Sequence, residues 1–86
     1  MPHVTIHIRP FCPYCVRARR LLEERGIDFQ EIDVSADAAK EARMRELAGR
    51  TSVPQIFIDG YHVGGSDELV AADASGLLAR LVGEAA

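Results

Sequence analysis

The chain has 86 residues, of which 48% are hydrophobic, and its formal net charge is −3 at pH 7. This length predicts one small domain over residues 1–86. The negative net charge does not support a nucleic-acid partner, and no apolar run is long enough to span a membrane. We therefore expect a monomer that acts in the cytoplasm, with neither nucleic acid nor membrane as a partner.

The first third of the chain predicts a strand followed by a helix. Apolar residues alternate with polar ones over residues 4–8, which is typical of a strand. We expect the helix to begin at Pro13, because the missing N–H of proline costs nothing in a first turn. Gly26 is placed to end this helix in the left-handed conformation.

A second strand and a second helix follow. Residues 27–34 predict the strand. Ser35 or Asp37 can cap the helix, which we expect to run toward Gly49. A strand, a helix and a second strand in this order predict a right-handed parallel unit.

The second half predicts a hairpin and two helical segments. Residues 55–58 and 61–63 predict its strands, joined by Asp59-Gly60, a pair that suits a type I′ turn. Ser66 can cap a short helix, and apolar spacing over 77–82 predicts the last one. We expect the break between the two near residues 73–76. We therefore expect an α/β fold of order βαβαββαα, in which a four-stranded mixed sheet carries helices on both faces.

Cys12 and Cys15 lie where the first strand leads into the first helix. The unpaired N–H groups and the dipole of a helix N-terminus favour an anion. The thiolate is the reactive form of cysteine in disulfide exchange, and Arg9 can add positive charge nearby. We predict that Cys12 attacks, and that Cys15, one turn into the helix, is more buried and resolves the product.

The other uses of a cysteine pair fit this chain less well. A bridge between two such close cysteines closes almost no loop, so it would stabilise the fold little. A closed zinc site needs four ligands; the chain has no other cysteine, and we interpret His3, His7 and His62 as surface or sheet-face residues. We predict no metal site within one chain; a metal bridged between two chains through Cys12 stays an alternative.

Pro54 directly precedes an apolar strand, where proline cannot donate to the ladder. The residue is either a plain strand-start proline or part of a cis Val53–Pro54 bond. In the second case the Val53 backbone would face outward and could pair with an extended, peptide-like ligand.

The segment from Gly64 to Asp67 also allows two interpretations. It can be a strand end followed by a helix cap, which the residues alone favour. It can also be a place where helix N–H groups take a ligand carboxylate while Asp67 takes an ammonium group.

Taken together, three segments resemble the dithiol glutaredoxins in order and spacing over nearly the whole chain. They are Cys12-Pro13-Tyr14-Cys15, the run from Thr51 through Val53-Pro54 to Asp59-Gly60, and Gly64-Gly65-Ser66-Asp67-Glu68-Leu69. The resemblance implies a thioredoxin-like fold with a cis-proline. It also implies reduction of protein–glutathione mixed disulfides and of protein disulfides, with glutathione as co-substrate and no tightly bound cofactor. The implied partners are glutathione and glutathionylated or disulfide-containing proteins.

The same resemblance assigns the residues of the site. Cys12 matches the nucleophile and Cys15 the resolving thiol. The implied glutathione-binding residues are Arg9, Tyr14, Ser52, Val53, Pro54, Gly65, Ser66 and Asp67. Arg9 stands for the usual lysine and would bind the glycine carboxylate. Val53 would pair through its backbone, and residues 65–67 would hold the γ-glutamyl end.

Two positions depart from the family pattern, and one alternative function remains. Phe11 stands where many members have threonine, which makes the rim of the site more apolar, and Ser52 replaces a common threonine. Tyr14 and Cys15 are inconsistent with the monothiol C-G-F-S motif of the branch that handles iron–sulfur clusters. The alternative function is that of an iron–sulfur cluster or soft-metal carrier that bridges two chains through Cys12.

Overall fold

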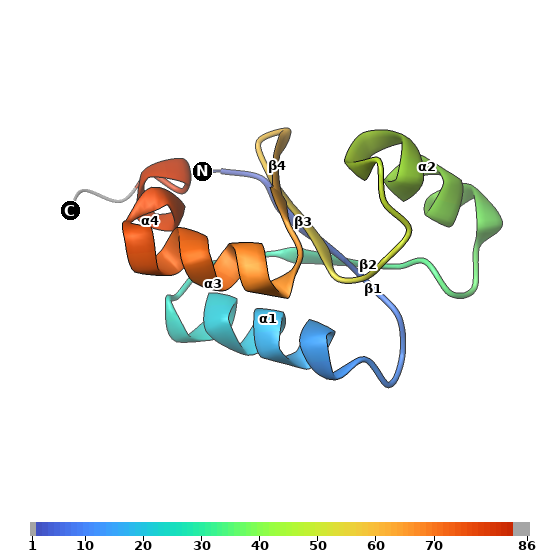
Figure 1. Cartoon of the computed structure of the whole chain (residues 1–86), viewed down its shortest axis with the longest axis horizontal. Helices are drawn as coiled ribbons and strands as arrows, with labels where there is room; N and C mark the ends of the chain where they lie inside the picture. Colours follow the sequence, from blue (N-terminus) through green and yellow to red (C-terminus); the bar gives the residue numbers. More distant parts are fainter. Residues whose placement is uncertain (1, 84–86) are drawn as a thin grey trace.

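The computed structural model describes residues 2–83 and contains four strands and four helices (Figure 1). In chain order they are β1 (Val4–Ile8), α1 (Pro13–Glu24), β2 (Gln30–Asp33), α2 (Ala38–Ala48), β3 (Gln55–Ile58), β4 (Tyr61–Gly64), α3 (Ser66–Ser75) and α4 (Leu77–Leu81). This order confirms the βαβαββαα pattern. No helix among residues 2–83 is long and apolar enough to cross a membrane.

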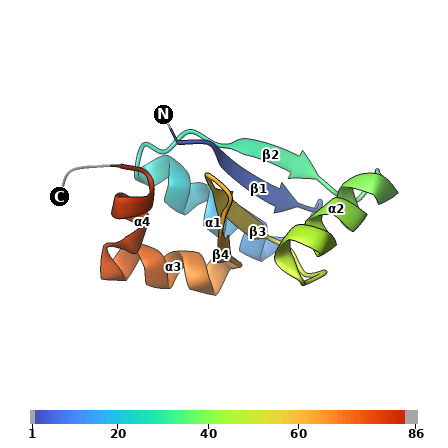
Figure 2. The same cartoon turned by 90° about the horizontal axis from the view of Figure 1, so that it is seen from above.

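The four strands form one mixed sheet in the order β2-β1-β3-β4. β1 runs parallel to β2, side by side in Figure 2, and antiparallel to β3, which pairs with β4 as a hairpin. Helices α1 and α3 lie on one side of the sheet and α2 lies on the other (Figure 1). The loop after β1 therefore carries Cys12 to the edge of the sheet where two parallel strands end.

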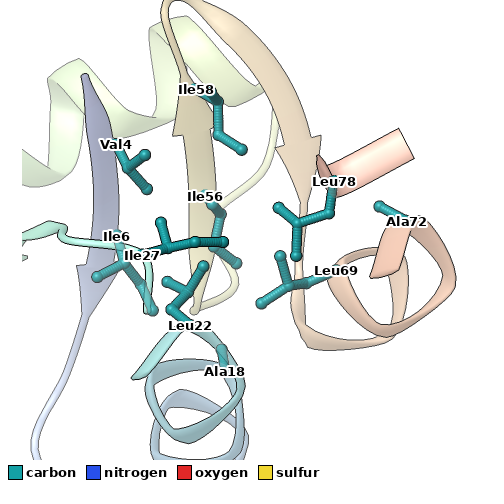
Figure 3. Close-up of a cluster of buried hydrophobic side chains, with 10 residues drawn as sticks. All are labelled: Val4, Ile6, Ala18, Leu22, Ile27, Ile56, Ile58, Leu69, Ala72 and Leu78. Atoms are coloured by element: carbon teal, nitrogen blue, oxygen red, sulfur yellow. The ribbon is translucent and has the colours of Figure 1, made fainter. Parts of the chain in front are cut away.

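The main core fills the space between the sheet and the helices α1, α3 and α4 (Figure 3). Its buried members are Val4, Ile6, Ala18, Leu22, Ile27, Ile56, Ile58, Leu69, Ala72 and Leu78. Alternate residues of β1 and β3 supply the sheet side of this cluster, as period-2 patterning predicts. The rigid packing of α1 on β1 fixes the direction in which the first turn of α1 points.

The second strand is shorter than the 27–34 expected from sequence. Ile27 donates its backbone N–H to the carbonyl of Leu22 at 2.9 Å, so it belongs to the end of α1 and not to the sheet. Gly26 before it has φ 68°, the left-handed conformation predicted for this position. The apolar character of Ile27 therefore predicts that the residue is buried, but it does not predict the backbone hydrogen-bond partner of Ile27.

The start of α3 differs from expectation in one detail. Ser66 does not cap α3: Gly65 takes the N-cap position, and Ser66 is the first helical residue. Glu68, three residues after Gly65, accepts the Gly65 N–H at 2.9 Å, as the N3 carboxylate of a capping box does, so the helix begins one residue earlier than expected. α3 then continues to Ser75, and Gly76 at φ 86° separates it from α4, within the stretch of residues 73–76 where the break is expected.

Candidate active site

Cys12 is the N-cap residue of α1 and is partly exposed. Its Sγ accepts a hydrogen bond from the backbone N–H of Cys15 at 3.2 Å. The same sulfur lies 3.9 Å from the carbonyl oxygen of Val53, within range of a weak S–H···O contact. An N–H donor and a helix N-terminus both stabilise negative charge on this sulfur.

Cys15 is buried, whereas Cys12 is partly exposed. Only 1% of Cys15 is exposed, and it lies on the buried face of α1 together with Ala18 and Leu22. Burial, followed by the hydrogen bond with Cys12, raises the pKa of the Cys15 thiol to about 11. Because the thiolate is the nucleophile, Cys15 is held in its unreactive form at neutral pH.

A hollow of about 180 Å³ lies beside Cys12, between the loop before β3 and the N-terminus of α3. It is lined by Tyr14, Arg50, Ser52, Val53, Pro54, Gly65, Ser66, Asp67 and Glu68. Seven of these nine residues are among the glutathione-binding residues expected from sequence. The Val53–Pro54 peptide bond in its wall is cis, as predicted.

Arg9 is the one expected glutathione-binding residue that does not line this hollow. Its guanidinium donates to the Glu41 carboxylate at 2.9 Å and to the Thr51 carbonyl at 3.1 Å. Arg9 therefore ties the end of β1 to α2 and to the segment that leads into Pro54. Its positive charge lies next to the loop before β3.

Two ion pairs at the hollow were not anticipated from sequence. Arg17 Nη1 lies 3.2 Å from Asp67 Oδ1, and Arg50 Nη1 lies 2.6 Å from Glu68 Oε1. The position of Glu68 three residues after Gly65 signals its contact with the Gly65 N–H, but no local pattern points to Arg50, 18 residues away. Arg17 lay within a basic segment whose simplest interpretation is a solvated helix face.

The loop that carries Val53 is supported from behind by Gln55. Its side-chain amide donates to the Ser52 carbonyl at 3.0 Å, and its side-chain oxygen accepts from His62 Nε2 at 2.7 Å. The His62 ring in turn stacks on Phe57, with ring centroids 4.8 Å apart. Together with a 3.3 Å contact from the same Gln55 amide to Ser52 Oγ, these bonds hold Ser52 in place relative to the sheet.

Among residues 2–83 no three His, Cys, Asp or Glu side chains gather as metal ligands would. His7 and His62, considered above as ligand candidates, pack against Phe57 on the sheet. The residues of a single chain that the structure describes thus offer no closed metal site.

A mixed four-stranded sheet with flanking helices, a Cys-x-x-Cys pair at the start of α1 and a cis-proline beside it define a thioredoxin-like oxidoreductase. Within that class, the glutaredoxin family model matches residues 4–63. The chain belongs to the glutaredoxin family, whose members are glutathione-dependent thiol oxidoreductases in general.

Individual relatives agree with this assignment. The chain is 49% identical over 82 residues to glutaredoxin 3 of Escherichia coli K12, covering 95% of this chain and 99% of that protein. Its structure resembles the solution structure of a glutaredoxin from Brucella melitensis, with a TM-score of 0.81, 49% identity and coverage of 92% and 86% of the two chains. A buckwheat glutaredoxin–glutathione complex matches with a TM-score of 0.84 at 26% identity, covering 93% and 76%.

Proposed function

We propose that the protein reduces protein–glutathione mixed disulfides and protein disulfides through the Cys12 thiolate. The observation that supports this most is the position of Cys12 Sγ. It accepts the Cys15 N–H at 3.2 Å and lies 3.9 Å from the Val53 carbonyl oxygen, beside a hollow of about 180 Å³ that Val53 and Pro54 help to line. A nucleophilic sulfur and a peptide-binding wall are thus adjacent.

The hollow suits the chemistry of glutathione at both ends. Val53 lies outside the strands, so its peptide groups take no part in the ladder and can pair with an extended ligand. At the far wall, N–H groups of the first turn of α3 favour the γ-glutamyl carboxylate, and Asp67 can accept from the neighbouring ammonium. Ser66 Oγ, buried there without a hydrogen-bond partner among residues 2–83, leaves a further donor at the same place.

Arg9 would serve the other end of the tripeptide. The glycine carboxylate needs a cation, and Arg9 already reaches the loop before β3 through the Thr51 carbonyl. Because the guanidinium has five N–H donors, its bonds to Thr51 and Glu41 leave others free for a ligand carboxylate.

In the proposed cycle the Cys12 thiolate attacks the glutathione sulfur of the mixed disulfide. A Cys12–glutathione bond forms, the bond to the substrate protein breaks, and that protein leaves as a thiolate that takes a proton from solvent. A second glutathione then releases reduced Cys12 and glutathione disulfide. In the dithiol route, Cys15 instead attacks the Cys12 sulfur, forms a Cys12–Cys15 disulfide and releases glutathione or the substrate as a thiolate. Two glutathione molecules then reduce that disulfide and leave as glutathione disulfide. The reducing cytosol supplies the glutathione on which the cycle depends.

The choice of reductant tests this proposal directly. We expect rapid turnover of a glutathionylated peptide with glutathione and glutathione reductase, and little with thioredoxin reductase alone. The opposite preference would place the protein in a thioredoxin-reductase-dependent class.

The alternative, a cluster or soft-metal carrier joined through Cys12, is not favoured. Within residues 2–83 no group of three candidate ligands exists, so such a metal would take its remaining ligands from other molecules. Anaerobic purification followed by visible absorption spectroscopy tests it: the redox proposal expects a colourless, active protein.

A further inference from the structure

Phe11, the residue before the nucleophilic cysteine, is in an unfavourable position that folding does not explain. Phe11 is fully exposed (103% relative to the extended residue), so its ring packs against no other part of the protein. Its φ is 58°, in the left-handed region, which is unfavourable for a bulky residue. A large apolar side chain held outward at such a cost is better explained by an external contact than by the core.

Phe11 forms part of a second hollow on the other side of Cys12. This hollow has a volume of about 350 Å³ and lies between the first turn of α1 and the end of β2. Its lining residues are Ile8, Arg9, Pro10, Phe11, Cys12, Pro13, Val16, Arg19 and Asp33. It shares no lining residue with the proposed glutathione hollow, and Val16, 42% exposed, adds a second apolar side chain on α1.

The charged groups at the edge of this second hollow already have partners. Arg9 is paired with Glu41 at 2.9 Å, and Arg19 with Glu31 at 3.3 Å. Asp33 accepts two hydrogen bonds from Ser35, at 2.8 and 2.6 Å. The remaining Arg9 donors are assigned to the glycine carboxylate of glutathione, so the surface left for the rest of the substrate is the apolar one formed by Phe11, Val16 and the two prolines.

We propose that Phe11 and Val16 bind an apolar side chain next to the modified cysteine of a glutathionylated polypeptide, and so select the substrate. This inference rests on the proposed function and names its substrate class. When glutathione occupies the first hollow, the substrate's cysteine sulfur is tethered about 2 Å from the glutathione sulfur at Cys12. The residues flanking that cysteine are then within reach of the free apolar surface beside Cys12.

The reaction on this substrate is a balanced exchange. The Cys12 thiolate forms a disulfide with the glutathione sulfur while the bond between the two substrate sulfurs breaks. The polypeptide thiolate leaves and takes a proton from solvent. Phe11 touches only the leaving polypeptide, so it affects which polypeptide is chosen and not the sulfur chemistry itself.

The test compares three substrates: two glutathionylated peptides that differ only in having leucine or glutamate after the cysteine, and the mixed disulfide of glutathione with 2-mercaptoethanol. For the unmodified protein we expect kcat/KM to favour the leucine peptide by about tenfold. Phe11→Asn, which tolerates the left-handed backbone, should reduce this preference to about twofold or less. Its turnover of the small mixed disulfide should stay unchanged.

Tyr61→Asn provides a matched control, because it removes another half-exposed aromatic residue, at the start of β4. This variant should keep the full peptide preference. Equal kcat/KM for both peptides in the unmodified protein, or a preference that survives in Phe11→Asn, would overturn the inference while leaving the proposed function intact. Failure of the unmodified protein to turn over any of the three substrates would instead overturn the proposed function, and the inference with it.

Discussion

Arg17 of α1 forms an ion pair with Asp67 in the first turn of α3, with 3.2 Å between Nη1 and Oδ1. The pair spans the space between two helices at the edge of the proposed glutathione hollow, and the Asp67 side chain is 80% exposed. The carboxylate that we assign to the ligand's ammonium group is thus already engaged by a cation of the protein. Glutathione binding has to replace or share this contact.

Removing that competitor should improve glutathione binding. We predict that Arg17→Gln lowers the KM for a glutathionylated peptide about twofold, a small effect because exposed ion pairs are weak. The difference should shrink at high salt. Arg43→Gln is the matched control, since it removes the same charge from an exposed pair with Glu46. A raised KM in Arg17→Gln would mean that Arg17 itself binds the ligand.

Arg9 should have the opposite effect. We predict that Arg9→Gln raises the KM for a glutathionylated peptide about tenfold, because a charge-assisted hydrogen bond to the glycine carboxylate of its glutathione is lost. kcat should change little, since Arg9 does not touch the reacting sulfurs. Arg9→Lys should restore much of the binding. Steady-state kinetics with varied glutathionylated peptide at a fixed concentration of glutathione checks this, and a fall in kcat at unchanged KM would contradict it.

The sequence predicts most of this fold because its local signals agree with one another. The strand pattern of residues 4–8, Pro13 at a helix start, Gly26 after a helix and Asp59-Gly60 in a hairpin each favour one structure, and each is confirmed. The same order of elements predicts that the loop carrying Cys12 lies at the carboxyl ends of the parallel strands. These features depend on neighbouring residues, so a single sequence contains them.

The remaining features differ in their origin. At two helix ends several local hydrogen bonds were possible: Ile27 bonds to Leu22 and not to the sheet, and Glu68 accepts the N–H of Gly65, which starts α3 one residue early. The ion pairs depend on distant residues, since the partners of Arg17 and Arg9 lie 50 and 32 residues away along the chain. Only the packing of α1 against α3 determines which carboxylate Arg17 meets.

The two cysteines should differ sharply in reactivity. We predict that iodoacetamide modifies Cys12 rapidly at neutral pH and leaves Cys15 unmodified. The pKa of Cys15 is raised to about 11, chiefly by burial, so its thiolate becomes abundant only as the pH approaches that value. Peptide mapping by mass spectrometry after a timed pulse checks this. The urea-unfolded chain is the control, because there both cysteines should react.

His7 should make the folded state sensitive to mild acid. It is buried on the sheet, and desolvation lowers its pKa from 6.5, more than the hydrogen bond to Gln55 raises it. Below pH 6.5 the unfolded chain therefore binds a proton that the folded chain does not. The free energy of unfolding should fall as the pH drops from 6.5 toward the lowered pKa in the folded state.

Urea unfolding at about pH 7.5 and about pH 5.5 measures this effect. We expect His7→Gln to lose less stability between the two values than the unmodified protein, while His3→Gln, at an exposed position, behaves like the unmodified protein. His62, whose pKa is also lowered by burial, should leave a smaller pH dependence in His7→Gln. An unchanged pH dependence in His7→Gln would exclude the buried imidazole as its source.

The most direct measurement is turnover of one glutathionylated peptide, with glutathione as reductant, by the unmodified protein, Cys12→Ser and Cys15→Ser. Our account predicts that Cys12→Ser is inactive, because the serine hydroxyl cannot act as the sulfur nucleophile, and that Cys15→Ser retains most of the activity. Activity that persists in Cys12→Ser would contradict the account.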